Sequence, residues 1–307
     1  MSVVLSDAAS IAPSSWSDET MVDRLPVCRQ WSRSSRFLVV KGFCRRKSET
    51  HRQYVKRVSG EYCILSVLSH TNIAHAEDLL MENYQFYIVM GLNDPGTPLT
   101  KWIKSTLDPV GDYAQLPMDI LKQVGLAVEY LHGLGVAHLD IHPDNILIVD
   151  RKLKLTNFSS AMVFQAPLQQ TQQRCSRLLG HAHGSFIAPE ALPFWQRPSS
   201  RYHDTPPQAQ TPITEHPAYY DARALDVWAM GIFALFLWQQ PHTTLWDLAS
   251  KRDHEFSLFT AHYANQSYPG FASIPRSLHK SLLYPMLCPD PQHRITIEQL
   301  MMQFPPN

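Results

Sequence analysis

Polar residues able to do acid–base or metal chemistry are concentrated in one stretch, His138-Leu-Asp-Ile-His-Pro-Asp-Asn145, between two apolar runs. Asp140 and Asn145 lie five positions apart across a proline, and the pattern predicts a loop that leads into a strand. Such a loop can hold a carboxylate and an amide oxygen on one side of a site. The carboxylate can accept a proton from a hydroxyl group, and the amide oxygen can bind a metal ion.

Further motifs follow this loop along the chain. A second short strand, after a turn at residues 150–152, leads to Asn157-Phe-Ser159. Later come Ala188-Pro-Glu190, Leu225-Asp-Val-Trp228 and Asp290-Pro-Gln-His-Arg294. In this order the motifs resemble the catalytic loop, the metal-binding motif, the end of the activation segment, the buried helix and the motif that supplies an arginine partner for Glu190 in protein kinases. The resemblance implies an α+β, two-lobed, protein-kinase-like fold.

The resemblance also implies a role for each polar residue of the loop. Asp140 would accept the proton of the substrate hydroxyl group, and Asn145 would bind a metal ion. His142 stands where serine/threonine kinases place a lysine against the terminal phosphate, and an imidazole is mostly neutral at pH 7. Asn157 replaces the aspartate of Asp-Phe-Gly, so the metal would lose an anionic ligand. By analogy with the removal of one preorganised electrostatic group, we expect at least about a 10²-fold loss in rate.

The nucleotide site that the resemblance implies lacks one of its parts. Lys41 is the candidate for the strand lysine that contacts the phosphates, and Glu61 is the candidate for its helical partner. Other nucleotide-contacting positions would be Met90, Leu92 and Leu147. The first glycine of the chain is Gly42, so the Gly-rich turn that covers the phosphates in this family is absent. We therefore expect the binding of ATP and Mg²⁺ to be weak or absent.

Other residues are expected to hold the fold whether or not the chain is active. Arg294 should pair with Glu190, and Asp226 should lie behind the catalytic loop. His138 and Phe158 are expected to pack in the apolar column that links the lobes of this family.

Plainer interpretations stay open at several of these positions. A histidine and an aspartate followed by an asparagine also describe a polar turn before a strand. Lys41 fits an edge-strand lysine that prevents aggregation, and Glu61 fits a solvated surface residue. Asp140 could serve only to hold its own loop.

The elements expected to position Lys41 and Glu61 lie early in the chain. Residues 1–36 show neither helical nor strand periodicity, and we interpret them as a mobile segment. Residues 37–90 are predicted to form a small, shortened, β-rich lobe, with a helix over about 50–69. A turn-rich connector at residues 91–98 is the predicted hinge.

Residues 99–307 are predicted to form the larger, helical lobe. An apolar stripe predicts the helix that leads to the catalytic loop, and its members are Ile120, Val124, Val128 and Leu131. A Pro-, Ser-, Thr- and His-rich stretch at about 196–217 is predicted to be an insertion loop.

Composition excludes some classes of partner and location. Lys plus Arg equals Asp plus Glu at 27 each, so no net charge favours nucleic acid or an anionic membrane surface. No run approaches about 18 apolar residues, and no leader pattern is present, so we expect a cytoplasmic protein without a membrane span. Five cysteines without metal-type spacing indicate reduced thiols.

Three functions fit these observations. We favour a pseudokinase, a binding or regulatory protein that acts on a protein partner. The alternative is a slow but active serine/threonine protein kinase that uses Asn145 as its main metal ligand and transfers the γ-phosphate of ATP to a protein hydroxyl group. A small-molecule phosphotransferase fits less well, because the Ala-Pro-Glu and Asp-Val-Trp motifs favour the protein-kinase branch. The sequence of residues 54–65 and 70–73 resembles that of fungal serine/threonine kinases that regulate nutrient and ion transporters.

Overall fold

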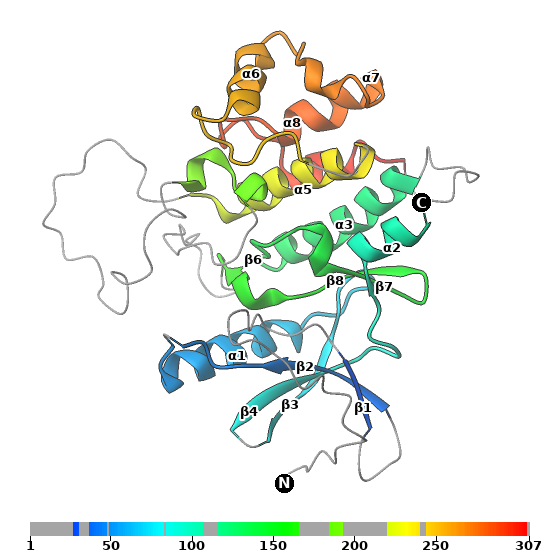
Figure 1. Cartoon of the computed structure of the whole chain (residues 1–307), viewed down its shortest axis with the longest axis vertical. Coiled ribbons are helices and arrows are strands. Elements are labelled where there is room, and N and C mark those ends of the chain that lie inside the picture. Colours follow the sequence, from blue (N-terminus) through cyan, green and yellow to red (C-terminus); the bar gives the residue numbers. More distant parts are fainter. Residues whose placement is uncertain are drawn as a thin grey trace, which may run out of the picture. The chain divides into compact units, whose positions relative to one another are not determined.

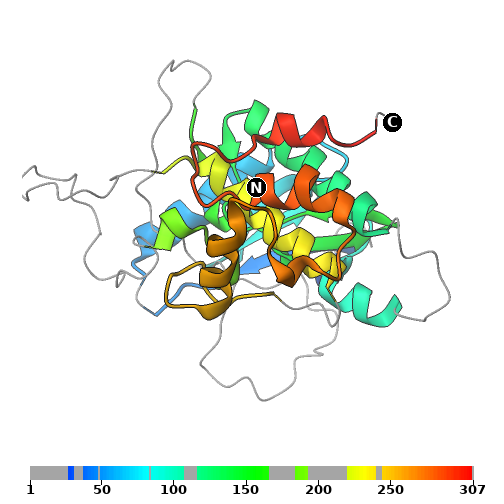
Figure 2. The same cartoon turned by 90° about the horizontal axis from the view of Figure 1, so that it is seen from above.

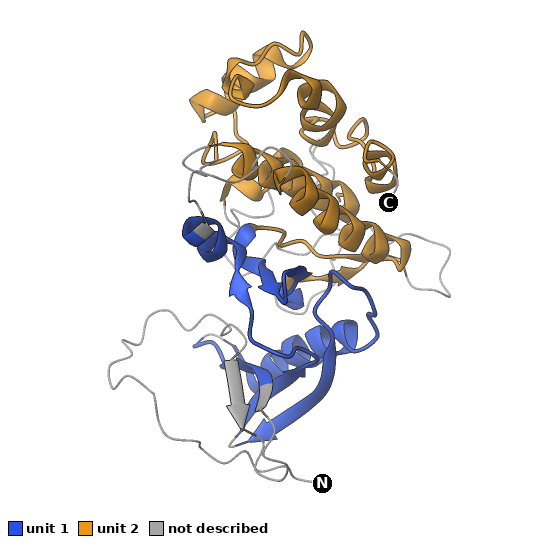
Figure 3. Cartoon of the chain, turned by 90° about the vertical axis from the view of Figure 1, so that its right-hand side faces the viewer, with its two compact units in different colours: residues 1–110, 143–159 blue, residues 111–142, 160–307 orange. Residues whose placement is uncertain are grey.

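The computed structural model describes residues 27–30, 37–47, 49–82, 84–106, 116–165, 184–192, 220–239 and 244–305 (Figure 1). The chain divides into two compact units (Figure 3). Unit 1 comprises residues 1–110 and 143–159, and unit 2 comprises residues 111–142 and 160–307. One boundary falls inside the predicted catalytic loop, so Asp140 belongs to unit 2 and Asn145 to unit 1.

Unit 1 contains a four-stranded antiparallel sheet in the order β1-β2-β4-β3. Its strands are β1 (Val27–Gln30), β2 (Phe37–Phe43), β3 (Ala76–Glu82) and β4 (Gln85–Met90). Side chains from β2, β3 and β4 form a buried apolar cluster of Val40, Leu80, Tyr87 and Val89. Lys41 lies in β2 opposite Ile88 of β4, so a central strand of the sheet carries the candidate lysine.

Strand β1 lies within the segment for which the sequence predicts no regular structure. It pairs with β2 from Val27 opposite Val40 to Gln30 opposite Phe37. Its four residues are too few to show periodicity, and the strand depends on hydrogen bonds with β2. The rest of the predicted mobile segment lies outside the described residues.

Strand β3 is an edge of this sheet, and β4 is its only strand partner among the described residues. The side chains of Glu77 and Asp78 are exposed, and Met81 is 60% exposed. Charged side chains on an edge strand discourage pairing with a strand of another molecule. The two carboxylates therefore oppose such pairing at β3.

Helix α1 (His51–Leu65) is shorter than the predicted helix at its carboxyl end. Thr50 caps its start, since the Gln53 amide donates to Thr50 Oγ1 over 3.3 Å and the Thr50 amide donates to Gln53 Oε1 over 2.8 Å. The buried residues of α1 are Tyr54, Val58, Glu61 and Leu65, at the spacing of one helix face. That spacing places Glu61 on the buried face.

A second sheet of unit 1 has the order β5-β7-β8, with β5 (Thr97–Pro98), β7 (Ile146–Val149) and β8 (Lys152–Leu155). Asp150 and Arg151 join β7 to β8 with positive φ angles of 48° and 61°, the twist that a two-residue hairpin turn requires. The hairpin brings the residue before β7, Asn145, close to the residues after β8. Unit 1 also contains α2 (Leu99–Thr106) and η1 (Pro143–Asn145), while η2 (Phe158–Ser160) begins at its end.

Unit 2 is mainly helical. Its longer helices are α3 (Leu116–Gly133), α5 (Ala222–Trp238) and α6 (His254–Tyr263). Its shorter helices are α7 (Arg276–Leu278), the π-helix η7 (His279–Leu283), α8 (Tyr284–Met286), α9 (Ile297–Met301), η3 (Gly184–Phe186), η4 (Pro189–Ala191) and η6 (Pro269–Phe271). Helix α5 is buried along most of its length and lies between α3 and α8 (Figures 1 and 2).

The predicted helix before the catalytic loop is confirmed as α3, and its apolar stripe is buried. Gly135 follows it with a φ of +74°, and a side chain there would lie 2.2 Å from the Gln165 carbonyl oxygen, so the turn requires glycine. The chain then forms β6 (Val136–Ala137), which pairs with β9 (Met162–Val163). Strands concentrated in unit 1 and helices in unit 2 confirm the predicted α+β composition.

Within the described ranges, no helix is both long and apolar enough to cross a membrane. The predicted insertion at about 196–217 lies outside these ranges.

Candidate active site

Lys41 and Glu61 form a buried ion pair in unit 1. Lys41 Nζ lies 2.6 Å from Glu61 Oε1, and their side chains are 4% and 0% exposed. Removing one partner of such a pair leaves a buried charge without compensation. The pair therefore holds the Lys41 side chain against the buried face of α1.

Asn157 connects this ion pair to Asn145. Lys41 Nζ donates to Asn157 Oδ1 over 2.9 Å, and Asn157 Nδ2 donates to Asn145 Oδ1 over 2.9 Å. An ammonium group can only donate, so the oxygen of Asn157 must face Lys41 and its nitrogen must face Asn145. Ser159 Oγ also donates to Asn157 Oδ1, over 3.0 Å. The lysine thus sets the direction of both amides.

The β7–β8 hairpin and α1 place Asn157 in this position. The Thr156 amide donates to the Asn145 carbonyl oxygen over 2.9 Å, next to the last pair of the hairpin. Asn157 has a φ of 63°, in the left-handed region that asparagine tolerates better than most residues. The Phe158 amide then donates to Glu61 Oε1 over 3.2 Å. The turn after β8 is therefore held by the same carboxylate that holds Lys41.

These residues, as arranged, do not fit Mg²⁺. The Asn157 oxygen faces an ammonium group, and the Asn145 oxygen accepts an amide hydrogen. Mg²⁺ favours anionic oxygen ligands in strict octahedral geometry. In the part of the chain that the structure describes, no group of three or more His, Cys, Asp or Glu side chains could hold a metal ion.

Asp140 and His142 lie close together in unit 2, and both are buried. His142 Nε2 is 3.6 Å from Asp140 Oδ1, too far for a good hydrogen bond. The His142 ring meets the Phe186 ring edge-on, with 6.1 Å between centroids. His138 supports the loop, because its Nδ1 accepts a hydrogen bond from the Asp140 amide over 3.2 Å.

Asp226 of α5 anchors the start of this loop. Its side chain is fully buried and accepts hydrogen bonds from the amides of His138, over 2.8 Å, and Leu139, over 2.7 Å. His132 Nε2 lies 2.9 Å from Asp226 Oδ2. Leu139 has a φ of 62°, a left-handed conformation that costs a leucine about 1–2 kcal/mol. The carboxylate therefore stabilises a strained turn directly before Asp140.

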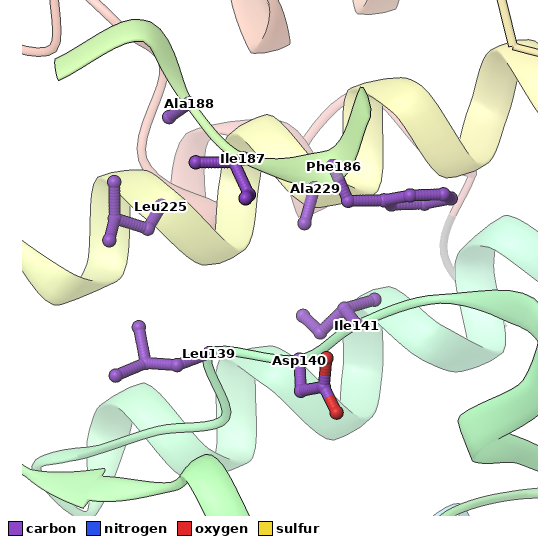
Figure 4. Close-up of a pocket in the computed structure, with 8 residues that line it drawn as sticks. All are labelled: Leu139, Asp140, Ile141, Phe186, Ile187, Ala188, Leu225 and Ala229. Carbon is purple, nitrogen blue, oxygen red and sulfur yellow. The ribbon is translucent and has the colours of Figure 1, made fainter. Parts of the chain in front are cut away.

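A small pocket in unit 2 lies beside Asp140 (Figure 4). The loop before β7, the end of η3 with the segment after it, and helix α5 contribute its lining. The lining residues are Leu139, Asp140, Ile141, Phe186, Ile187, Ala188, Leu225 and Ala229. Asp140 is the only charged residue of this lining, so the pocket presents one carboxylate among apolar side chains.

Arg294 and Glu190 form a bidentate ion pair within unit 2. The two terminal nitrogens of Arg294 donate to the two carboxylate oxygens over 2.7 Å and 3.0 Å. Arg294 also donates to the carbonyl oxygens of Ala224 and Cys288, and its guanidinium lies 5.0 Å from the centroid of the Trp228 ring. These contacts tie the segment after η3 to α5 and to the carboxyl-terminal region of the unit.

The structure thus gathers the predicted site residues in groups. Lys41, Glu61, Asn145, Asn157 and Phe158 are joined by contacts in unit 1, and His138, Asp140, His142 and Asp226 are joined in unit 2. The proposed nucleotide contacts are also in unit 1, where Met90 and Leu147 are buried and Leu92 is half-buried.

Two contributing residues were not identified from the sequence. Ser159 orients the Asn157 amide, and its place two positions after Asn157 was the available signal. His132 lies against Asp226 from the end of α3. Only its position in the last helical turn before Gly133 set it apart, and that pattern is equally typical of an ordinary helix end.

Comparison with known proteins shows the family of the chain. The protein kinase domain model matches residues 27–304. Serine/threonine-protein kinase hal4 of Schizosaccharomyces pombe is 31% identical over 277 residues, which cover 89% of this chain and 38% of that protein. Serine/threonine-protein kinase HAL4/SAT4 of Saccharomyces cerevisiae is 27% identical over 273 residues, which cover 88% of this chain and 40% of that protein.

A third relative is the nitrogen permease reactivator protein of Saccharomyces cerevisiae, 27% identical over 216 residues, which cover 69% of this chain and 23% of that protein. The chain thus spans less than half the length of each of these three relatives. Because the family model matches nearly the whole chain, this chain belongs to the protein kinase family.

Proposed function

We propose that this chain is a pseudokinase, which binds or regulates a protein partner and is impaired in phosphoryl transfer. The observation that carries the proposal is the hydrogen bond from Asn157 Nδ2 to Asn145 Oδ1. In active protein kinases an aspartate and an asparagine at these two positions hold the Mg²⁺ ions that neutralise the phosphates. Here Asn157 instead donates a hydrogen bond to the side-chain oxygen of Asn145.

The charges that remain support weak nucleotide binding. Lys41 and Glu61 remain as a buried pair at 2.6 Å, but residues 1–36 contain no glycine that could form the Gly-rich turn that brings amide groups to the phosphates in this family. A polyphosphate entering this site would meet one cation, Lys41, and neutral amides. Phosphoryl transfer depends mainly on positioning and charge stabilisation, so these losses affect the chemical step directly.

We expect ATP to raise the unfolding midpoint only slightly and Mg²⁺ to add little to that effect. A ligand at 100 times its dissociation constant stabilises a protein by roughly 2.7 kcal/mol, so a thermal-shift titration can detect tight binding easily. The measurement compares ATP alone, Mg²⁺ alone and both together. A large shift that requires both would contradict the proposal.

A slow but active serine/threonine kinase is the second candidate function. The buried Lys41–Glu61 pair favours it, and so does the retained carboxylate of Asp140 beside the apolar pocket. The relatives named as serine/threonine kinases favour the same chemistry. In this alternative, the Asn145–Asn157 hydrogen bond opens when nucleotide binds.

Asn157→Asp distinguishes the two candidates. The new carboxylate cannot donate, so the hydrogen bond from position 157 to Asn145 Oδ1 is lost and position 157 gains an anionic oxygen. An anionic oxygen is a ligand that Mg²⁺ favours, and we expect ATP with Mg²⁺ to raise the midpoint of this variant more than that of the parent. Transfer to a protein substrate should stay near background, because catalytic groups act as a unit and single repairs are not additive.

The matched control is Asn265→Asp, which makes the same chemical change at an exposed position. This control should respond to Mg²⁺ like the parent chain. Measurable phosphoryl transfer by the parent, lost on Asp140→Ala, would replace the pseudokinase by the slow kinase.

A further inference from the structure

Four exposed cationic residues lie in the loop before α1 and in its first two turns, and we call them the cationic patch: Arg45, Lys47, Arg52 and Lys56. Within the described residues, none of their side chains has a hydrogen-bond or ion-pair partner. The whole chain has equal numbers of basic and acidic residues, so the patch is a local excess. Glu49 is the only acidic residue in the segment 44–57.

The cationic patch lies where positive charge is least favourable for the helix. The amino end of a helix carries a partial positive charge, and the first turn of α1 contains no acidic residue. Arg52 and Lys56 are four positions apart, and like charges at that spacing destabilise a helix by about 0.2–0.5 kcal/mol. Local rules of this kind are broken mostly at functional sites.

The backbone beneath the patch is fixed by the remaining charges. Arg57 Nε and Nη2 donate to the two oxygens of Glu49, over 2.9 Å and 3.0 Å, and Nη2 also donates to the Cys44 carbonyl oxygen over 3.0 Å. Both side chains are more than nine-tenths buried. The Arg46 amide donates to Glu49 Oε2, and the capped Thr50 follows. The one carboxylate of the segment 44–57 is therefore occupied in holding the loop against the helix.

We infer that the cationic patch binds an acidic segment of a partner protein. Its residues lie on one short loop and the first two turns of one helix, an extent along the chain that suits a short run of Asp and Glu. Arginine can bind a carboxylate through two parallel hydrogen bonds, and both arginines are exposed. The net charge of zero gives no general attraction to nucleic acid or to an anionic membrane. Binding at the patch does not depend on whether the chain transfers phosphate.

The test is the binding of a fluorescently labelled glutamate-rich peptide to the full chain, measured by anisotropy. We expect binding that weakens as salt is added, and no binding of a glutamine-rich peptide of the same length. Changing all four patch residues to glutamine should weaken binding by roughly tenfold or more, since each exposed pair contributes about 0.2–1 kcal/mol. The unfolding midpoint of this variant should be unchanged or higher, because cations leave the positive end of a helix.

A control variant changes two lysines and two arginines elsewhere on the surface to glutamine: Lys101, Lys251, Arg252 and Arg276, all exposed. It should bind the peptide like the parent chain. Equal weakening by both variants, or no binding by the parent, would overturn the inference. The inference would also be overturned if the parent chain bound phosphatidylserine vesicles more tightly than the peptide and only the patch variant lost that binding. The patch would then be a membrane-binding site.

Discussion

Replacing Arg294 by alanine should lower the free energy of unfolding by about 3–5 kcal/mol, the usual cost of breaking a buried ion pair. The Glu190 side chain is only 10% exposed and would lose both of its hydrogen bonds from the guanidinium. The carbonyl oxygens of Ala224 and Cys288 would lose a donor as well. The unfolding midpoint should fall by roughly 10 °C, which a thermal melt can measure.

Arg223→Ala is the matched control for this prediction. Arg223 pairs with Asp221 at 2.7 Å, but the two side chains are 38% and 45% exposed, so solvent screens the pair. Its loss should cost no more than about 1 kcal/mol. A midpoint of Arg294→Ala as high as that of Arg223→Ala would show that the bidentate pair with Glu190 does not stabilise unit 2.

Replacing Asp226 by asparagine should destabilise the protein by about 3 kcal/mol or more, because two buried backbone amides depend on this carboxylate. Asparagine keeps the volume but offers a single acceptor oxygen, and its nitrogen would face another donor. Amide hydrogen exchange at His138 and Leu139 should accelerate beyond the change in global stability, since the strained turn at Leu139 loses its support.

Asp253→Asn provides the comparison. Asp253 also accepts backbone hydrogen bonds, from the amides of Asp247, Leu248 and Phe256, but it is half-buried at the start of α6. Water can replace those partners, so the cost should stay near about 1 kcal/mol. Equal losses for Asp253→Asn and Asp226→Asn would mean that burial of Asp226 contributes nothing.

Regular elements with a strong pattern could be predicted from the sequence. The apolar segment at residues 37–43 is β2, and the stripe that begins at Ile120 is buried along α3. The pairing of Arg294 with Glu190 across 104 positions came from family resemblance, because no local pattern specifies so distant a contact. Strand β1 was missed, since a four-residue strand depends on its partner.

The candidate site was predictable in its residues but not in its hydrogen bonds. The sequence shows that Asn157 replaces an acidic ligand. It does not show that the amide of Asn157 donates to Asn145, because Lys41, 116 positions away, sets the direction of that amide. Similarly, the hydrogen bond from the Phe158 amide to Glu61 depends on how α1 packs against the sheet. Contacts of this kind arise from packing between distant elements.

Strand β3, which has no second strand partner among the described residues, bears on how the protein behaves at high concentration. Two copies that approached each other edge to edge would bring Glu77 and Asp78 of one near the same carboxylates of the other, which opposes self-association. Dissolved ions weaken this repulsion, since the screening length falls to about 3 Å at 1 M ionic strength. Met81, 60% exposed, would then offer an apolar contact. Association of two copies through this strand should therefore increase as salt is added.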